Sequence, residues 1–222
     1  MHIRILTAAD VRAALSMAEA IDAVARAYSQ LSAGKATMPL RSRFHTEKGV
    51  TLLMPAHLHD SGDFAVKIVS VYADNPKLGL PTVAATVLAL DPQTGMPLAL
   101  MEGDSLTALR TGAAGGVAAR YLARADAGTV ALFGAGVQAR AQLQAAMAVR
   151  DIKHVWIVDP FASAAQRLAD DIAGWPDAPA VTLADSPQTA VAQANIVLAA
   201  TTATTPLFDG NDLKPGTHVT GV

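Results

Sequence analysis

A glycine-containing turn between an apolar run and an Ala/Gln-rich segment offers the clearest chemistry in this chain. It reads Gly134-Ala135-Gly136-Val137-Gln138-Ala139 and follows the apolar residues 129–133. Gly134 allows a tight turn, and Gly136 lets the backbone approach a phosphate because no Cβ stands in the way. Ala139 replaces the third glycine of the usual pattern with another small residue. The turn predicts a dinucleotide site at a helix N-terminus, the alternative being a strand–helix turn without ligand.

A carboxylate follows this turn at the spacing that dinucleotide sites use. Asp159 ends the next apolar run, about 20 residues after the turn, and would accept hydrogen bonds from the adenine-ribose hydroxyls. The same carboxylate repels a 2′-phosphate, and the nearest following arginine, Arg167, lies well inside the next helix. The sequence therefore predicts NAD as the cofactor, with NADP as the alternative.

Three basic residues in the first half of the chain are candidates for binding an anion. Lys67 lies within the apolar run 64–71, where a buried lysine would need an anionic partner. The alternative is that Lys67 points to solvent from an edge strand. Arg110 lies among residues too small to shield it, and a guanidinium suits a carboxylate. Arg43 precedes a predicted strand, a position where most arginines are simply solvated.

The histidine pattern gives no sign of a metal site, and the absence of cysteine excludes cysteine-based chemistry. His57 and His59 form an isolated pair in a predicted loop, without a third ligand at a fixed spacing, so we expect no metal site. The chain has no cysteine, which excludes disulfides, thiolate catalysis and cysteine-based zinc sites.

The elements that must position these residues change in character along the chain. Thr7-Ala8-Ala9-Asp10 predicts a helix start, and apolar spacing continues this helix to a stop at Gly34. Short β-type runs follow, with a hairpin-like turn at 91–95 between the last two, and then a small-residue helix over 105–123. The predicted strands of this half are Val50–Met54, Phe64–Tyr72, Val83–Leu90 and Leu98–Glu102.

Beyond residue 126 strands and helices alternate, which predicts a parallel sheet with right-handed crossovers. The fold class is therefore α/β, with a substrate-binding and dimerisation domain at 1–126 and a Rossmann dinucleotide-binding domain at 127–222. The chain stops inside an apolar strand, 218–222, and shows five strands of the usual six. We therefore expect a fragment of a longer protein that lacks its last strands. The strands are Val130–Phe133, His154–Val158, Val181–Leu183, Ile196–Ala200 and His218–Val222, and the helices Val137–Val149, Ala162–Ile172 and Pro187–Ala192.

Composition limits the partners of the chain. Hydrophobic residues make up 51% of the 222 residues and charged residues 16%, which indicates an ordered globular protein. A formal net charge of −2 gives no reason to expect nucleic acid or an anionic membrane as partner. No apolar run approaches the roughly 20 residues that span a bilayer, and no signal peptide precedes the first helix. A cytoplasmic location is the expectation.

Several of these segments occur in the order and spacing of one known family. Over essentially its whole length the chain resembles the ornithine cyclodeaminase/μ-crystallin family. The segments are Arg43, Leu53-Met54-Pro55, Phe64-Ala65-Val66-Lys67, Asn75-Pro76, Leu80-Pro81-Thr82, Leu109-Arg110-Thr111-Gly112-Ala113 and the turn at 134–139.

The resemblance implies a substrate domain, a Rossmann NAD(P) domain and a homodimer formed through the first domain, where the apolar stretch 83–100 offers an exposed face. It implies that Arg43, Lys67 and Arg110 bind a substrate carboxylate. Lys67 is also a candidate for proton transfer, because desolvation lowers the pKa of a lysine. The implied cofactor site is lined by Thr82, Arg110, Thr111, Gly134, Gly136, Val137, Gln138, Asp159 and Thr201.

The chain departs from the family pattern at two points, and the second bears on the expected substrate. The family's catalytic aspartate would lie beyond Val222. Members acting on ornithine carry an acidic residue just before Leu-Met-Pro, where this chain has Leu52. We therefore expect an NAD(P)-dependent oxidoreductase acting on the C–N bond of small α-amino or α-imino acids, of the alanine dehydrogenase or Δ1-pyrroline-2-carboxylate/ketimine reductase type. The alternatives are ornithine cyclodeaminase and a non-catalytic, μ-crystallin-like protein that binds a dinucleotide and a ligand.

Overall fold

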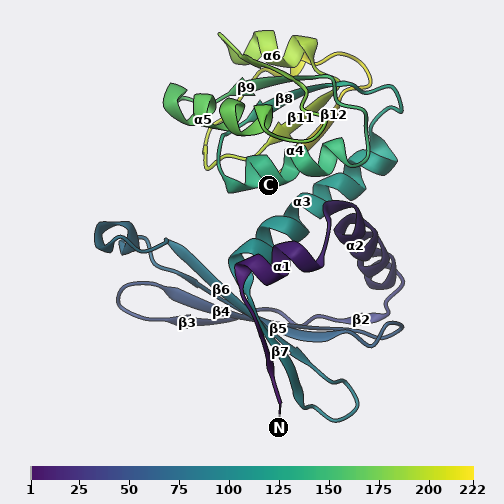
Figure 1. Cartoon of the computed structure of the whole chain (residues 1–222), viewed down its shortest axis with the longest axis vertical. Coiled ribbons are helices and arrows are strands. Elements are labelled where there is room, and N and C mark those ends of the chain that lie inside the picture. Colours follow the sequence, from purple (N-terminus) through teal and green to yellow (C-terminus); the bar gives the residue numbers. More distant parts are fainter. Residues whose placement is uncertain (1) are drawn as a thin grey trace. The chain divides into compact units, whose positions relative to one another are not determined.

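The computed structural model describes residues 2–222 as two compact units (Figure 1). The first unit contains residues up to Ser16 and Ala23–Thr107, and the second contains Met17–Asp22 and Ala108–Val222. The division thus falls within two helices, α2 (Met17–Ser32) and α3 (Gly103–Leu122), whereas the predicted domain boundary at 126/127 follows the end of α3.

A seven-stranded sheet forms the first unit, in the order β1-β7-β6-β5-β4-β2, with β3 also paired to β4. All neighbours are antiparallel except β1 and β7. The predicted turn at 91–95 is confirmed, because the N–H of Gly95 donates to the carbonyl of Asp91 at 2.8 Å. The strands are β1 (Arg4–Leu6), β2 (Ala36–Thr37), β3 (Ser42–His45), β4 (Val50–Leu58), β5 (Phe64–Val71), β6 (Val83–Leu90) and β7 (Pro97–Glu102).

The single helix predicted from Thr7 to Gly34 is wrong. The chain forms α1 (Ala8–Ala14) and α2, because the backbone of Leu15 is extended, with φ −145° and ψ 116°. The predicted start is confirmed: the Thr7 hydroxyl accepts from the N–H of Asp10, and the Asp10 carboxylate accepts from the N–H of Thr7. A short 3₁₀ turn, η1 (Asn75–Leu78), connects β5 and β6.

The second unit is a five-stranded parallel sheet in the order β10-β9-β8-β11-β12. Counted from β8, this is the order 3-2-1-4-5 of an open Rossmann sheet, so the predicted α/β fold with a Rossmann-type unit is confirmed. Its strands are β8 (Thr129–Phe133), β9 (His154–Val158), β10 (Ala180–Leu183), β11 (Ile196–Ala199) and β12 (His218–Gly221). Its helices, besides α3, are α4 (Val137–Met147), α5 (Ala162–Ala173), α6 (Pro187–Gln193) and the 3₁₀ turn η2 (Gly210–Asp212).

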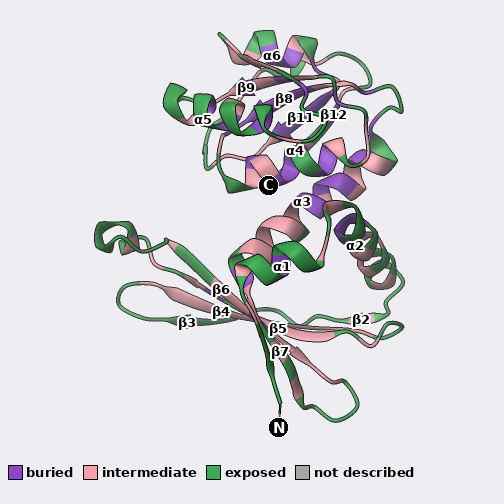
Figure 2. Ribbon diagram, in the orientation of Figure 1, coloured by how far each residue is buried: buried purple, intermediate pink, exposed green. Residues whose placement is uncertain are grey.

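Alternate residues of β8 pack into two separate cores, as expected for a sheet covered on both faces. Val130 and Leu132 join a cluster that includes residues of α4 and α5, whereas Ala131 and Phe133 join one that includes residues of α6. Figure 2 shows the central strands of this unit in the colour of buried residues. This packing fixes the carboxyl ends of the strands, where the functional residues lie.

Within residues 2–222, none of the helices combines the length and apolar character needed to cross a bilayer. The cytoplasmic location stays a prediction.

Candidate functional site

The turn after β8 is built so that only glycine fits its first position. Gly134 has φ +95°, and a Cβ added there would lie 2.2 Å from the carbonyl oxygen of Ala200. The N–H of Gly134 donates to the carbonyl of Val158 at 2.9 Å, which ties the turn to the end of the neighbouring strand. The close approach of β8 and β11 at this point therefore depends on the missing side chain.

Gly136 differs, because a Cβ added there would meet no atom within 4 Å. It is the N-cap of α4, an 11-residue helix, and as a glycine it supplies no side-chain oxygen to cap the first turn. The free space and the N–H groups of a helix start together suit an anionic oxygen.

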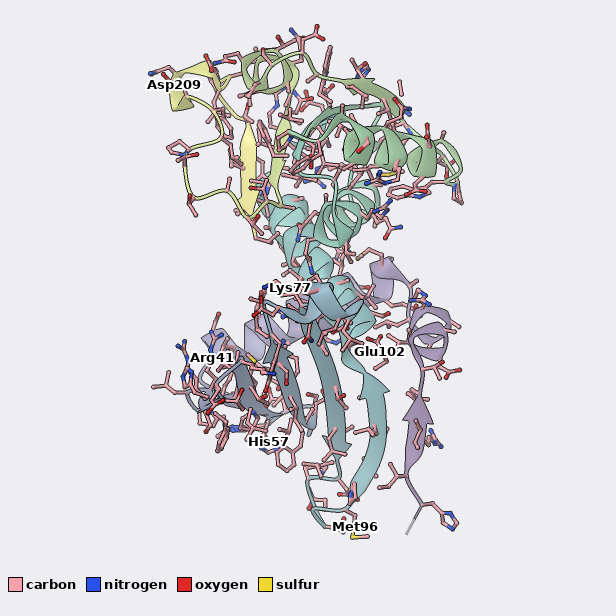
Figure 3. The ribbon with its side chains drawn as sticks, turned by 90° about the vertical axis from the view of Figure 1, so that its left-hand side faces the viewer. Arg41, His57, Lys77, Met96, Glu102 and Asp209 are labelled. Carbon is pink, nitrogen blue, oxygen red and sulfur yellow. The ribbon has the colours of Figure 1, made fainter. Side chains whose placement is uncertain are left out.

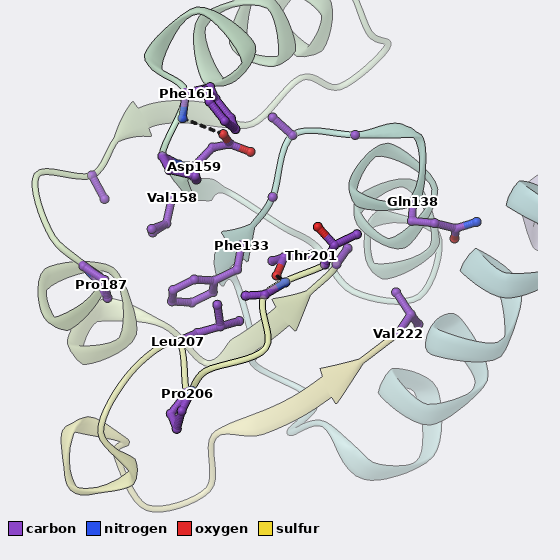
Figure 4. A pocket seen from close by; sticks show the side chains of 18 of the residues that line it. Phe133, Gln138, Val158, Asp159, Phe161, Pro187, Thr201, Pro206, Leu207 and Val222 are labelled. Atoms are coloured by element: carbon purple, nitrogen blue, oxygen red, sulfur yellow. Dashed lines mark hydrogen bonds between the residues drawn. The ribbon is translucent and has the colours of Figure 1, made fainter. Parts of the chain in front are cut away.

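These features open on a cavity of about 1070 Å³ at the carboxyl ends of the parallel strands (Figure 4). In Figure 4, Asp159 and Phe161 lie at one side of the cavity and Gln138 and Val222 at the other. The residues that line it are Thr111, Phe133–Gln138, Val158–Phe161, Ala184–Pro187, Ala200–Ala203, Pro206, Leu207 and Val222.

Asp159 presents its carboxylate to this cavity in a fixed orientation. Its Oδ1 accepts a hydrogen bond from the backbone N–H of Phe161 at 2.8 Å. Its second oxygen has no hydrogen-bond partner among residues 2–222. That oxygen is available to the hydroxyls of a ribose.

The charges around the cavity have one sign. Asp159 and Asp185, which follow the neighbouring strands β9 and β10, both line it, and in the part of the chain that the structure describes no Lys, Arg or His does. A cavity of this kind disfavours an additional phosphate on the adenosine ribose.

Most of the predicted cofactor residues come together in this one cavity. They are Thr111, Gly134, Gly136, Val137, Gln138, Asp159 and Thr201. Thr82 belongs to the first unit, and Arg110, although exposed on α3 in the second unit, is not among the lining residues. The roles expected of Thr82 and Arg110 stay predictions.

The strand register of the first unit brings Arg43 and Lys67 to one face of its sheet. Arg43 pairs with Leu52, and Lys67 pairs with Met54; since Leu52 and Met54 are two residues apart on β4, all four side chains share this face. Val69, which pairs with Leu52, lies on the same face and is buried. Lys67 is half-buried there, and β5 lies between β4 and β6, so the alternative of an edge strand is wrong.

This shared face, which we call the cationic face, carries no carboxylate in the described strands. Besides Arg43 and Lys67, its charged positions are Arg4 and, in its protonated form, His45. The strand residues of this face therefore suit an anionic group.

Sequence reasoning missed two lining residues with evident chemistry, Phe161 and Asp185. Phe161 is 71% exposed although it is aromatic, and Asp185 follows β10 as Asp159 follows β9. The rule that ligands bind outside the carboxyl ends of parallel strands points to Asp185, because β10 was itself predicted. For Phe161 the signal was weaker, because only its place two residues after Asp159 suggests it.

The predicted loop around the histidines is partly wrong. His57 lies in β4 (Figure 3) because this strand continues past Met54 through Pro55 to Leu58, paired with β5. His59 hydrogen-bonds the Thr37 hydroxyl through Nε2 at 2.8 Å. Within residues 2–222 no group of three or more His, Asp or Glu side chains is arranged to hold a metal ion.

Glu102 fixes the start of α3, the helix that carries Arg110 and Thr111 (Figure 3). Its carboxylate accepts from the N–H groups of Asp104 and Ser105, at 2.6 and 3.0 Å. Burial by itself would raise the pKa of Glu102, but these hydrogen bonds and the nearby Arg12 outweigh it and leave that pKa lowered. Burial and the neighbouring Glu102 charge raise the pKa of Asp104.

Comparison with known proteins places this arrangement among amino-acid and imino-acid enzymes. A Δ1-pyrroline-2-carboxylate reductase of Bacillus cereus is 37% identical over 220 residues, covering 98% of this chain and 67% of that protein. The structure of a Thermococcus litoralis Δ1-pyrroline-2-carboxylate reductase, in complex with NADH and L-proline, is 42% identical, with a TM-score of 0.91 over 99% of this chain and 68% of that one. An archaeal alanine dehydrogenase dimer with bound NAD is 36% identical, with a TM-score of 0.90 over 99% of this chain and 67% of that one.

The chain thus spans about two thirds of the length of these relatives. The profile of one family, described as ornithine cyclodeaminase/mu-crystallin, matches residues 1–222. The family resemblance carried by the glycine turn, Lys67 and Arg110 is thereby confirmed, and the chain belongs to the ornithine cyclodeaminase/mu-crystallin family.

Proposed function

We propose that the chain is the NAD-binding and substrate-binding part of an oxidoreductase acting on the C–N bond of small α-amino or α-imino acids. The observation that carries this proposal is the cavity in which the Gly134–Gly136 turn and Asp159 meet, with no Lys, Arg or His among its described lining residues. Relatives named as Δ1-pyrroline-2-carboxylate reductase and alanine dehydrogenase, two of them solved with NADH or NAD, support it.

The residues of the cavity fit a dinucleotide. Gly136 and the first turn of α4 would hold the pyrophosphate, because the space beside Gly136 is free of protein atoms. The free oxygen of Asp159 would accept from the adenosine ribose, and the exposed ring of Phe161 offers a flat surface to the adenine. When bound, NAD supplies the hydride acceptor, and NADH the hydride donor, for the substrate Cα.

The cationic face would bind the substrate carboxylate. Arg43 offers a bidentate fork and Lys67 a point charge, so together they would neutralise and orient one carboxylate. Lys67, being half-buried, is also our candidate for proton transfer to or from the substrate.

The substrate's side chain should be short or apolar. Leu52 and Met54 separate Arg43 from Lys67 on the cationic face, and the strands of that face carry no carboxylate to pair a distal amine. An unpaired ammonium against apolar side chains is unfavourable. This favours a cyclic imino acid or a small amino acid over ornithine.

Parallel substrate assays test the proposal. We expect NADH oxidation with Δ1-pyrroline-2-carboxylate, or with pyruvate plus ammonia, to exceed any conversion of ornithine. Proline formed from ornithine with no net change in NADH would overturn the reductase assignment in favour of a cyclodeaminase. NADH binding without turnover of any of these substrates would instead indicate a ligand-binding protein.

We also propose that the chain forms a homodimer through the other face of its first sheet. Strand register puts Ile5, Phe44, Ile68 and Leu100 on this opposite face, where they are 74%, 56%, 38% and 37% exposed. Exposed apolar side chains on one sheet face favour a protein partner, and a dimeric relative supports a second copy. Ile68→Glu should convert the dimer to a monomer in light scattering. A monomeric wild-type protein, or a variant that stays dimeric, would contradict this assembly.

A further inference from the structure

One fully buried polar side chain lies between α3 and α4 in the second unit. Gln142 of α4 is 2% exposed, and its Nε2 donates to the backbone carbonyl of Thr111 at 2.9 Å. In an α-helix that carbonyl also accepts the N–H four residues further on, so the Gln142 amide adds a second donor to it. Thr111 lines the dinucleotide cavity.

The facing helix is shaped to admit this amide. A Cβ added to Gly115 would lie 1.9 Å from the Oε1 of Gln142, and one added to Gly112 would lie 2.6 Å from the carbonyl oxygen of Ala141. The close approach of α3 and α4 therefore depends on these glycines, and the Gln142 amide has a defined place between the helices.

The same amide leaves one atom unsatisfied. The Oε1 of Gln142 is buried and has no hydrogen-bond partner within residues 2–222. An unsatisfied buried acceptor costs about 1–3 kcal/mol, whereas a neutral hydrogen bond contributes about 1 kcal/mol net. Gln142 therefore contributes little or nothing to the free energy of unfolding. An apolar side chain of similar length would fill the space without the unsatisfied acceptor.

We propose that Gln142 is a positioning residue for the cofactor site, holding Thr111 where its side chain meets the dinucleotide. This inference rests on the proposed function, because it assumes that NAD occupies the cavity that Thr111 lines. Gln142 itself lies behind the wall and does not line the cavity. Its effect on binding would therefore act through Thr111.

Gln142→Met tests the proposal because stability and affinity should move differently. Methionine keeps the length of the side chain, loses the bond to Thr111 and removes the unsatisfied oxygen. We expect the urea midpoint to stay unchanged or rise, while the Kd for NADH, measured by fluorescence titration, rises about fivefold. Gln142→Leu should behave alike. The matched control is Gln144→Met, since Gln144 is exposed on the same helix, and it should change neither quantity.

A double-mutant cycle with Thr111→Val tests whether Gln142 affects NADH binding through Thr111. If Gln142 acts through Thr111, Gln142→Met changes the NADH Kd less than twofold once Val replaces Thr111. If the two substitutions change the NADH Kd additively, the proposal is overturned. It is also overturned if Gln142→Met lowers the urea midpoint together with the NADH affinity. Unchanged affinity in Gln142→Met beside a wild-type protein that binds NADH would overturn this inference alone. Failure of the wild type to bind NADH would overturn the proposed function.

Discussion

The Asp159 carboxylate accepts a hydrogen bond from the backbone N–H of Phe161 at 2.8 Å, which ties the acidic group to the loop that leads into α5. The two residues thereby form one side of the cavity (Figure 4). Because one carboxylate oxygen is held by the loop, the other has a defined direction before any ligand arrives. Preorganisation of this kind lowers the entropy lost on binding.

The preference for NAD should depend on two carboxylates. Asp159→Asn should weaken NADH binding about tenfold, because the ribose loses a charged acceptor. This variant should still reject NADPH, since Asp185 also lines the cavity. Only Asp159→Asn combined with Asp185→Asn should bind NADPH measurably, in the same fluorescence titration. Asp63→Asn, an exposed change in the first unit, is the control. NADPH binding by the Asp159 variant alone would remove Asp185 from this role.

Alanine at the two glycines of the turn should have different effects, on folding at Gly134 and on NADH binding at Gly136. Gly134→Ala strains a residue at φ +95° and drives a methyl group against the Ala200 carbonyl, so we expect a lower melting temperature or an insoluble protein. Gly136 has φ −85° and open space, so Gly136→Ala should fold normally. Its methyl group would occupy the space proposed for the pyrophosphate and raise the NADH Kd about tenfold or more. Normal NADH affinity in folded Gly136→Ala would contradict the proposed pyrophosphate position.

Substitutions on the cationic face should weaken substrate binding and leave NADH binding unchanged. Lys67→Met and Arg43→Met should each raise the KM for Δ1-pyrroline-2-carboxylate about tenfold or more, because each removes a charged partner of the carboxylate. The NADH Kd should not change. Arg41→Met is the matched control, being an exposed arginine outside the described strands. An equal effect of Arg41→Met would indicate that general positive charge, and not this face, attracts the substrate.

The Rossmann unit could be predicted from sequence because its signals are local. The strands after residue 126 are apolar runs, and the turn at Gly134 combines a special backbone conformation with a helix start. Both properties belong to a few neighbouring residues. The strand bounds therefore differ from the prediction by at most one residue at each end.

The first unit was harder because its structure depends on distant pairing. The break at Leu15 is hidden by an apolar residue that continues the helical pattern. The strand Ser42–His45 has no alternating apolar pattern and is exposed along its whole length, so it exists only through its pairing with β4. The common face of Arg43 and Lys67 is likewise a consequence of register across three strands, which no single segment contains.

Glu102 predicts a change of stability with pH. Its folded-state pKa is lowered, so its contribution is complete above its unfolded pKa and is lost as the pH falls through the folded pKa. Glu102→Gln should therefore lower the melting temperature at pH 7, and the difference from wild type should shrink below about pH 4. Asp104→Asn should do the opposite at pH 7, because the raised pKa of Asp104 means that its charged form is disfavoured in the fold. A difference for Glu102→Gln that stays constant across pH would contradict this account.

Arg150 closes the C-terminal ends of two helices in the second unit. Its guanidinium donates to the backbone carbonyls of Arg120, Ala123, Arg124 and Val149, at 2.9, 2.7, 2.8 and 2.7 Å. These are carbonyls at or just beyond the ends of α3 and α4, which lack partners inside the helices. One side chain therefore anchors the end of the helix that carries Thr111.

Arg150→Met should destabilise the protein by about 2–4 kcal/mol, since it leaves several partly buried carbonyls without a charged donor. Arg150→Lys should recover only part of this loss, because an ammonium cannot reproduce the spread of a guanidinium. Urea denaturation measures both. The control is Lys153→Met, whose exposed ion pair with Asp151 at 2.6 Å should contribute less than about 1 kcal/mol. If Arg150→Met costs no more than Lys153→Met, the carbonyls are satisfied by solvent and the proposed anchoring of α3 fails.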